Sequence, residues 1–177
     1  MIIKTENMET TEYPETETLA RLYKVFDLGY QPGIEGPQHE IALLFELDAL
    51  TPDKKPMTIT KRFTASMHPK ANLRKFIEAW RGSPFNDDEV KIFDTDTLEG
   101  QYAFLTFTKK KSNKTGKVWT DIFQIRRKPR EVPPFQKRLQ PGFVPDWIKQ
   151  AIEKQIQNPG QTQCAGSAPE YDDIPAF

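Results

Sequence analysis

The stretch MTITKRFTASMHPKANLRKFIEAWRG, residues 57–82, changes its hydrophobic period part-way along and thereby decides the fold. Its first part alternates, so that Met57, Ile59 and Phe63 fall on one side of an expected strand. Its second part repeats apolar residues at i, i+3, i+4 and i+7, the stripe of an amphipathic helix: Leu73, Phe76, Ile77 and Trp80. We therefore expect a strand followed by a helix whose apolar stripe lies in the core.

Proline and glycine delimit this helix. Pro69 suits its first turn and Gly82 its end. The next segment, NDDE (86–89), has the form of a second helix start, with Asn86 as the cap and Glu89 in the reciprocal position of a capping box.

Four other segments carry strand-like alternation. They are LARLYKVFDLGY (19–30), HEIALLFEL (39–47), QYAFLTFT (101–108) and KVWTDIFQIR (117–126). In the first of them, four apolar residues share one parity and are expected on one buried face: Ala20, Leu22, Phe26 and Leu28. A last segment, DWIKQAIEKQI (146–156), predicts a short helix.

The order of three strands, one helix and two strands matches the OB-fold, a five-stranded Greek-key barrel. We therefore expect a mainly β protein with one helix between the third and fourth strands. In an OB-fold the ligand crosses the second and third strands and is gripped by the loops that join strands 1 and 2 and strands 4 and 5. Here those loops are QPGIEGPQ (31–38) and KKKSNKTGK (109–117), and the second is the most basic stretch of the chain.

Charge divides the chain into a basic body and two acidic ends, although the whole chain is formally neutral. Residues 1–18 carry a net charge of −4, residues 19–149 of +7 and residues 150–177 of −3. Residues 109–138 alone hold 11 Lys and Arg against two acids. This concentration of positive charge favours an anionic partner.

Composition also predicts the limits of the domain. Residues 1–18 have almost no apolar periodicity and are expected to form a disordered acidic arm. The OB-fold domain, with its short terminal helix, is expected over 19–157. A flexible linker is expected over 158–169, and an acidic tip that binds partner proteins over 170–177.

Few residues of the chain suit catalysis, metal binding or membrane insertion. Cys164 is the only cysteine, and neither His39 nor His68 has a nucleophile or a metal-ligand pattern beside it. No apolar run is long enough to span a bilayer, and the first residues lack the layout of a signal peptide. We therefore expect a cytoplasmic protein that needs no cofactor, inserts into no membrane and is not an enzyme.

One acidic cluster leaves an enzymatic alternative open. Its carboxylates could hold Mg²⁺ for a nuclease, although acids also gather at helix starts because the helix dipole favours them there. The cluster consists of Asp87, Asp88, Glu89, Asp94 and Asp96. The nuclease alternative predicts Mg²⁺-dependent cleavage of DNA.

Binding of single-stranded DNA has more support than catalysis. It requires cations that neutralise phosphates and aromatic faces on which bases stack. The candidate residues are Arg21, Tyr23, Tyr30, Arg62, Lys109, Lys110, Lys111, Lys114, Lys117, Trp119 and Arg126. Trp119 shares its parity with Phe123 and Ile125, so its assignment to base stacking or to the core stays open.

The end of the chain, YDDIPAF (171–177), resembles the acidic C-terminal tip of bacterial single-stranded-DNA-binding proteins. That resemblance implies docking onto replication and repair proteins, with the terminal phenyl ring in an apolar pocket and the carboxylates against basic residues. The residues that would dock are Asp172, Asp173, Ile174, Pro175 and Phe177. The chain departs from the family pattern in two ways, because Ala176 precedes the terminal phenylalanine and two aspartates stand where three are usual.

The body carries a second resemblance, in ARLYKVFDLGYQ, KRFTASMHPKANLRKFIEAWRGSPF and GKVWTDIFQI. These stretches are similar to a family of phage-encoded proteins regarded as OB-fold binders of single-stranded DNA. The resemblance implies a role in phage replication or recombination in the cytoplasm of a bacterial host. A protein–protein adaptor on the same fold is the alternative, and the sequence leaves open whether the chain forms a homo-oligomer.

Overall fold

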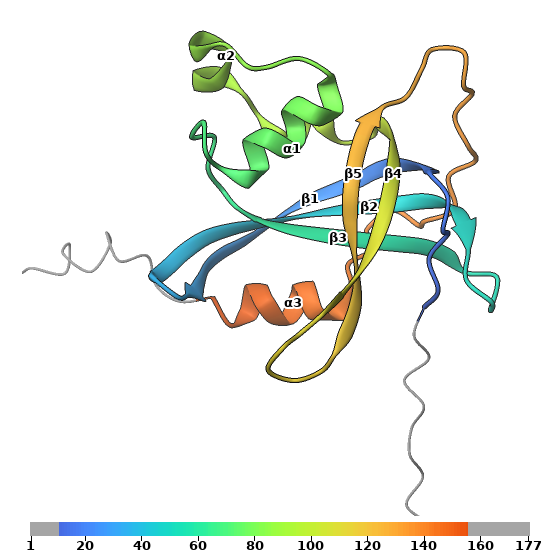
Figure 1. The fold of residues 1–177 in the computed structure, drawn as a ribbon, viewed down its shortest axis with the longest axis horizontal. Coiled ribbons are helices and arrows are strands. Elements are labelled where there is room, and N and C mark those ends of the chain that lie inside the picture. The colour runs from blue at the N-terminus through green and yellow to red at the C-terminus, as the bar shows by residue number, and fades with distance from the viewer. Residues whose placement is uncertain (1–10, 156–177) are drawn as a thin grey trace, which may run out of the picture.

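The computed structural model describes residues 11–155, and these residues form a mainly β structure, as expected (Figure 1). The elements are β1 (Thr18–Gly33), β2 (Gly36–Leu50), β3 (Pro56–Thr64), α1 (Asn72–Arg81), α2 (Asp87–Ile92), the 3-10 helix η1 (Thr95–Leu98), β4 (Tyr102–Lys111), β5 (Val118–Arg127) and α3 (Asp146–Glu153). The five strands form one antiparallel sheet in the order β3-β2-β1-β4-β5. Three consecutive strands with the fourth beside the first are the strand order of a Greek key.

The two outer strands of the sheet approach each other. The Lys61 ammonium on β3 donates to the Asp121 carboxylate (2.6 Å) and to the Ile122 carbonyl (3.0 Å) on β5. Within residues 11–155 no strand pairing joins β3 to β5, so the sheet is open. Figure 1 shows the β4–β5 hairpin crossing the other three strands.

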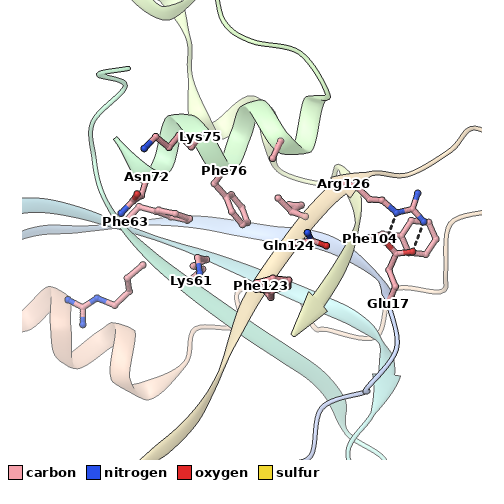
Figure 2. A pocket seen from close by; sticks show the side chains of 13 residues that line it. Glu17, Lys61, Phe63, Asn72, Lys75, Phe76, Phe104, Phe123, Gln124 and Arg126 are labelled. Carbon is pink, nitrogen blue, oxygen red and sulfur yellow. Dashed lines mark hydrogen bonds and ion pairs between the residues drawn. The ribbon is translucent and has the colours of Figure 1, made fainter. Parts of the chain in front are cut away.

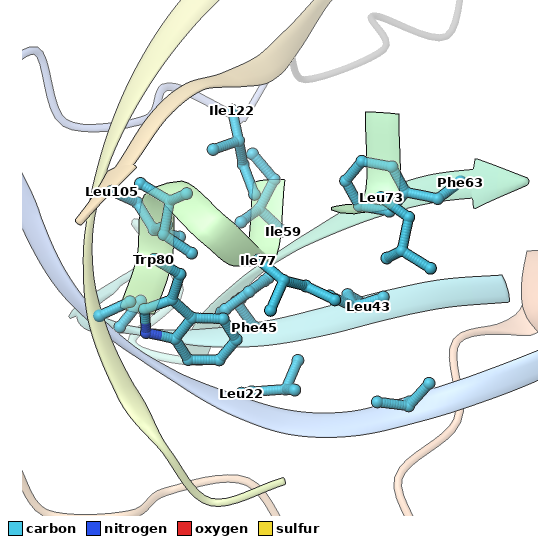
Figure 3. Packing of buried hydrophobic residues seen from close by; sticks show 14 of the residues in the cluster. Leu22, Leu43, Phe45, Ile59, Phe63, Leu73, Ile77, Trp80, Leu105 and Ile122 are labelled. Carbon is cyan, nitrogen blue, oxygen red and sulfur yellow. The ribbon is translucent and has the colours of Figure 1, made fainter. Parts of the chain in front are cut away.

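Helix α1 closes the core against the sheet, as its apolar stripe predicts. Leu73, Ile77 and Trp80 are buried, and Figure 3 shows them directed toward the side chains of the strands. The Trp80 indole donates to the Tyr102 carbonyl (3.1 Å), which satisfies its only polar group. Gly82 ends the helix with φ at 75°, in the left-handed region that favours glycine.

The connection between β3 and β4 differs from the single helix that the sequence predicts. The helix begins at Asn72 after the N-cap Ala71, so Pro69 lies before it rather than in its first turn. The helix start expected at residues 86–89 is confirmed, because Asn86 and Glu89 form a complete capping box at α2. Helix α2 and η1 therefore add to α1 in this connection.

A β-bulge in β1 divides its apolar residues between two faces. The register with β2 shifts between Leu22 and Lys24, which leaves Tyr23 as the extra residue. Ala20 and Leu22 lie in the core under α1, whereas Phe26 and Leu28 lie on the other face, in a second cluster with Ile148 of α3. The prediction of one shared face is therefore wrong, because parity reverses at the bulge.

The expected loop 31–38 is mostly strand. Pairing between β1 and β2 continues until Gly33 lies opposite Gly36, which leaves only Ile34 and Glu35 in the turn. Gly36 has φ at 116°, a value that permits so tight a turn.

The described part of the N-terminal arm packs on the sheet, unlike the disordered arm expected over 1–18. The Tyr13 hydroxyl donates to the Thr58 carbonyl (2.8 Å), and its ring lies 5.5 Å from that of Phe107. Burial raises the pKa of Tyr13.

The linker expected over 158–169 and the tip expected over 170–177 lie outside the described residues. No helix within residues 11–155 is both long and apolar enough to cross a membrane.

Candidate functional site

A groove of about 710 Å³ opens where β3, β5 and α1 meet (Figure 2). We call it the seam groove. Its lining residues come from five segments of the chain: Glu17; Lys61, Arg62 and Phe63; Asn72, Lys75, Phe76 and Ala79; Phe104; Phe123, Gln124, Ile125 and Arg126. A second hollow of about 580 Å³ shares Arg62, Phe63 and Asn72 with it, so the two are adjacent, and the second reaches His68 and Lys70.

Phe123 is exposed in this groove because β5 contains a bulge. The register with β4 passes from Gln124 to Ile122 and leaves Phe123 without a partner. Ile122 and Ile125 are therefore both buried, whereas 67% of Phe123 is exposed. The exposed ring offers a face to a ligand, and sequence parity alone places it beside Ile125.

The same register decides the position of Trp119. It lies opposite Lys110 near the end of the hairpin, 44% exposed and outside the buried core. Of the two assignments that parity leaves open, the structure excludes the core.

Two arginines at the seam groove have carboxylate partners. Arg62 pairs with Glu40 and lies over the Trp147 ring of α3, 5.8 Å from its centroid. Arg126 pairs with Glu17 and lies 4.6 Å from the centroid of the Phe104 ring (Figure 2). The hydrogen bond from Arg126 lowers the pKa of the Glu17 carboxyl. A phosphate entering the groove would compete with these carboxylates for the guanidinium groups.

Lys75 is the least neutralised cation of the seam groove. It projects from α1 and has no carboxylate partner among residues 11–155. The helix period places Lys75 one turn from Asn72, on the same side of α1. Whether that side lines the groove depends on how α1 packs on the sheet, which the sequence does not give. Sequence reasoning missed Lys61, Lys75, Phe104 and Phe123.

The five predicted lysines lie on the β4–β5 hairpin but do not form one row. Residues 109–119 are called the lysine hairpin below. Lys110 shares a face with Trp119, whereas Lys109 and Lys111 point to the other face, because side chains alternate along a strand. Lys114 and Lys117 are exposed in the turn.

Asp121 connects the lysine hairpin to the seam groove. Its carboxylate accepts from Lys110 on β4 and from Lys61 on β3. Burial by itself raises the pKa of Asp121, but the two lysine hydrogen bonds outweigh it and lower the pKa. This residue therefore ties together three strands where the sheet edges meet.

Arg21 and Tyr23 serve the fold rather than the groove. Arg21 is buried and donates to the fully buried Glu46 carboxylate (2.7 Å). Glu46 also accepts from the Arg138 and Leu139 amides at 2.6 and 3.0 Å. Burial alone would raise the pKa of Glu46, but these hydrogen bonds lower it.

The Tyr23 hydroxyl donates to the Gln140 carbonyl (2.7 Å) and accepts from the Phe143 amide (2.9 Å). Together with Glu46 it holds the segment that leads into α3 against the outer face of β1 and β2. Helix α3 thus covers part of the strand face that a ligand would cross in an OB-fold.

Tyr30 also lies outside the seam groove. It is a residue of β1, and its ring stacks on that of His39, with centroids 5.3 Å apart and planes at 17°. His39 in turn contacts the Asp27 carboxylate at 2.7 Å. Of the predicted residues, Arg62 and Arg126 therefore line the groove, whereas the lysines and Trp119 lie on the hairpin.

The acidic cluster at 87–96 has structural roles. Glu89 belongs to the capping box and pairs with Arg81 (3.0 Å), and the Asp94 carboxylate caps η1. Within residues 11–155, no three His, Cys, Asp or Glu side chains converge to hold a metal ion.

No protein-family model matches this chain. No curated protein matches it either.

The partner-binding residues predicted at the tip, from Asp172 to Phe177, lie outside the described residues.

Proposed function

We propose that this protein binds single-stranded DNA with little sequence preference. The observation that supports the proposal is the seam groove, which is lined by four cations (Lys61, Arg62, Lys75 and Arg126) and by the phenylalanines Phe76, Phe104 and Phe123, with the buried Phe63 at its base. Cations that follow a phosphate backbone, beside aromatic faces for bases, are the combination that such binding requires.

The chemistry favours a single strand over a duplex. An aromatic ring such as that of Phe123 can stack only on a base that is not already stacked inside a double helix. The exposed lysines of the hairpin attract either form, since they recognise phosphate alone. The groove would therefore provide the discrimination, and the lysine hairpin would add affinity without sequence preference.

We further propose that the open sheet is an OB-type barrel in which the β3 and β5 edges close through Lys61 and Asp121. Its strand order and the helix between β3 and β4 support this proposal. On the strength of the two resemblances, the protein would act in phage DNA replication or recombination in a bacterial cytoplasm. It would do no covalent chemistry and would recruit partner enzymes through residues 170–177.

Fluorescence anisotropy tests the proposal. A labelled poly-dT oligonucleotide and a duplex of equal length are titrated with the full chain at several salt concentrations. We expect tight binding of the single strand, weak binding of the duplex and a steep loss of affinity with salt. Absence of binding to the single strand at low salt would reject the proposal and favour the adaptor alternative. Mg²⁺-dependent loss of the label's anisotropy through cleavage would favour the nuclease.

A further inference from the structure

A second basic pocket, of about 540 Å³, lies beyond the end of α1. Its cations come from the end of α1 and from the end of β5 with the segment that follows: Arg81, Arg127, Lys128 and Arg130. Trp80, Leu98 and Tyr102 contribute apolar surface, and no aspartate or glutamate among residues 11–155 lines the pocket. We call it the α1-end pocket.

The cations of this pocket are only partly neutralised. Arg81 pairs with Glu89 (3.0 Å), and the Lys128 ammonium donates to the Pro129 (3.1 Å) and Val132 carbonyls. Arg127 and Arg130 have no carboxylate partner among residues 11–155. Four cations gather at one hollow, and only Arg81 among them has a carboxylate partner within residues 11–155. Their mutual repulsion disfavours the empty pocket and favours an anion in it.

The α1-end pocket and the seam groove lie on opposite sides of the end of β5. Arg126 lines the groove and Arg127 lines the pocket, because consecutive residues of a strand point to opposite faces. Helix α1 contributes to both hollows, with Lys75 and Phe76 at the groove and Arg81 at the pocket. Figure 2 shows Arg126 at the end of the groove, close to the end of β5.

We propose that the α1-end pocket binds phosphates of the same single strand after it leaves the seam groove, so that the strand turns around the end of β5. This inference rests on the proposed function. Arginine suits the role because its planar guanidinium binds phosphate through two parallel hydrogen bonds. The Tyr102 ring, which is partly exposed at the pocket and packs edge-on against Phe135 (5.5 Å), offers a face for a base.

Oligonucleotides of graded length test the path. Anisotropy with dT oligomers from about 4 to about 30 nucleotides compares the wild type with the double variant R127Q/R130Q. The control K24Q/K55Q removes the same charge at two exposed lysines that line neither hollow. Thermal unfolding shows that each variant is folded.

We expect R127Q/R130Q to bind the shortest oligomers within about twofold of the wild type and to gain less affinity with length. For the long oligomers its salt slope should fall by about 1.4, since each lost phosphate contact on a single strand removes about 0.7. Binding equal to that of K24Q/K55Q at every length would overturn the inference and leave the groove proposal standing. Equal loss at all lengths would place the arginines in the groove and overturn the extended path.

Two further outcomes separate the remaining cases. If the wild type binds no oligomer, the proposed function and this inference fall together. If R127Q/R130Q loses binding only to a synthetic peptide with the sequence of residues 170–177, the pocket is a site for an acidic peptide and the phosphate path is overturned.

Discussion

The lysine hairpin and the seam groove are both basic, yet they differ in what surrounds their charge. Lys109, Lys111, Lys114 and Lys117 are exposed and have no carboxylate partner among the described residues. In the groove, Lys61, Arg62 and Arg126 are each paired with an acid, and phenyl rings line the same hollow. The hairpin therefore provides unpaired positive charge on an exposed surface. The groove provides a hollow lined by rings, in which acids already neutralise three of the four cations.

This difference assigns separate contributions to the two regions. Unpaired surface lysines neutralise phosphates, release counterions and make affinity fall with salt. A groove lined by rings contributes stacking, which salt affects little and which a duplex cannot use. Substitutions in the lysine hairpin should therefore alter the salt slope of DNA binding. Substitutions in the seam groove should alter the preference for single strands over duplex.

The largest effect is expected from removing the free charge of the hairpin. The variant K109Q/K111Q/K114Q/K117Q should lose about a hundredfold or more in affinity for poly-dT at about 50 mM salt, with a salt slope smaller by about 3. Anisotropy at several salt concentrations measures both quantities. A slope equal to that of the wild type would mean that the hairpin is only a solvated turn.

Truncation of the exposed ring in the groove tests the stacking contribution. F123A should weaken poly-dT binding by about 1–3 kcal/mol, roughly fivefold to 150-fold, without changing the salt slope. I92A is the control, because Ile92 is an apolar residue of α2 that is even more exposed (84% against 67%) but lines neither hollow. Similar affinities for F123A and I92A would remove Phe123 from the interface.

Asp121 joins the two regions, and its loss should act on stability. D121N leaves Lys61 and Lys110 without their charged partner and should cost about 1–2 kcal/mol at neutral pH. The folded protein lowers the pKa of Asp121, so the contribution of the carboxylate is present above its unfolded pKa and is lost as pH falls through the folded one.

Thermal unfolding between neutral pH and about pH 3 checks this prediction. The difference in Tm between wild type and D121N should be largest near neutrality and should shrink below about pH 4. A difference that does not change with pH would show that the loss comes from packing rather than from charge.

The smallest effect is expected from the carboxylate that neutralises the groove. E17Q frees Arg126 for a phosphate and should tighten poly-dT binding by no more than about fivefold, because an exposed ion pair contributes about 0–1 kcal/mol. E15Q, at a neighbouring exposed acid without an ion-pair partner in the described residues, is the matched control. Weaker binding by E17Q than by E15Q would mean that Glu17 holds Arg126 in place for DNA rather than competing with phosphate for it.

Much of the fold could be predicted from local patterns. The stripe of α1, its glycine stop and the capping box of α2 depend on residues within a few positions of one another, and all three are present. The strand segments follow from alternation, which needs only neighbouring residues. The exact face of each strand residue did not follow, because the bulges at Tyr23 and Phe123 depend on the partner strand.

The sequence by itself determined the order of the elements, the burial of Trp80 and the concentration of lysines on one hairpin, because each is encoded in a short window. Only the tertiary structure decided the roles of three arginines. Arg21 forms a buried ion pair with Glu46, 25 positions away, whereas Arg62 and Arg126 both line a groove built from five separate segments. Charge can be read residue by residue, but burial, pairing and the shape of a groove depend on which distant segments the fold places in contact.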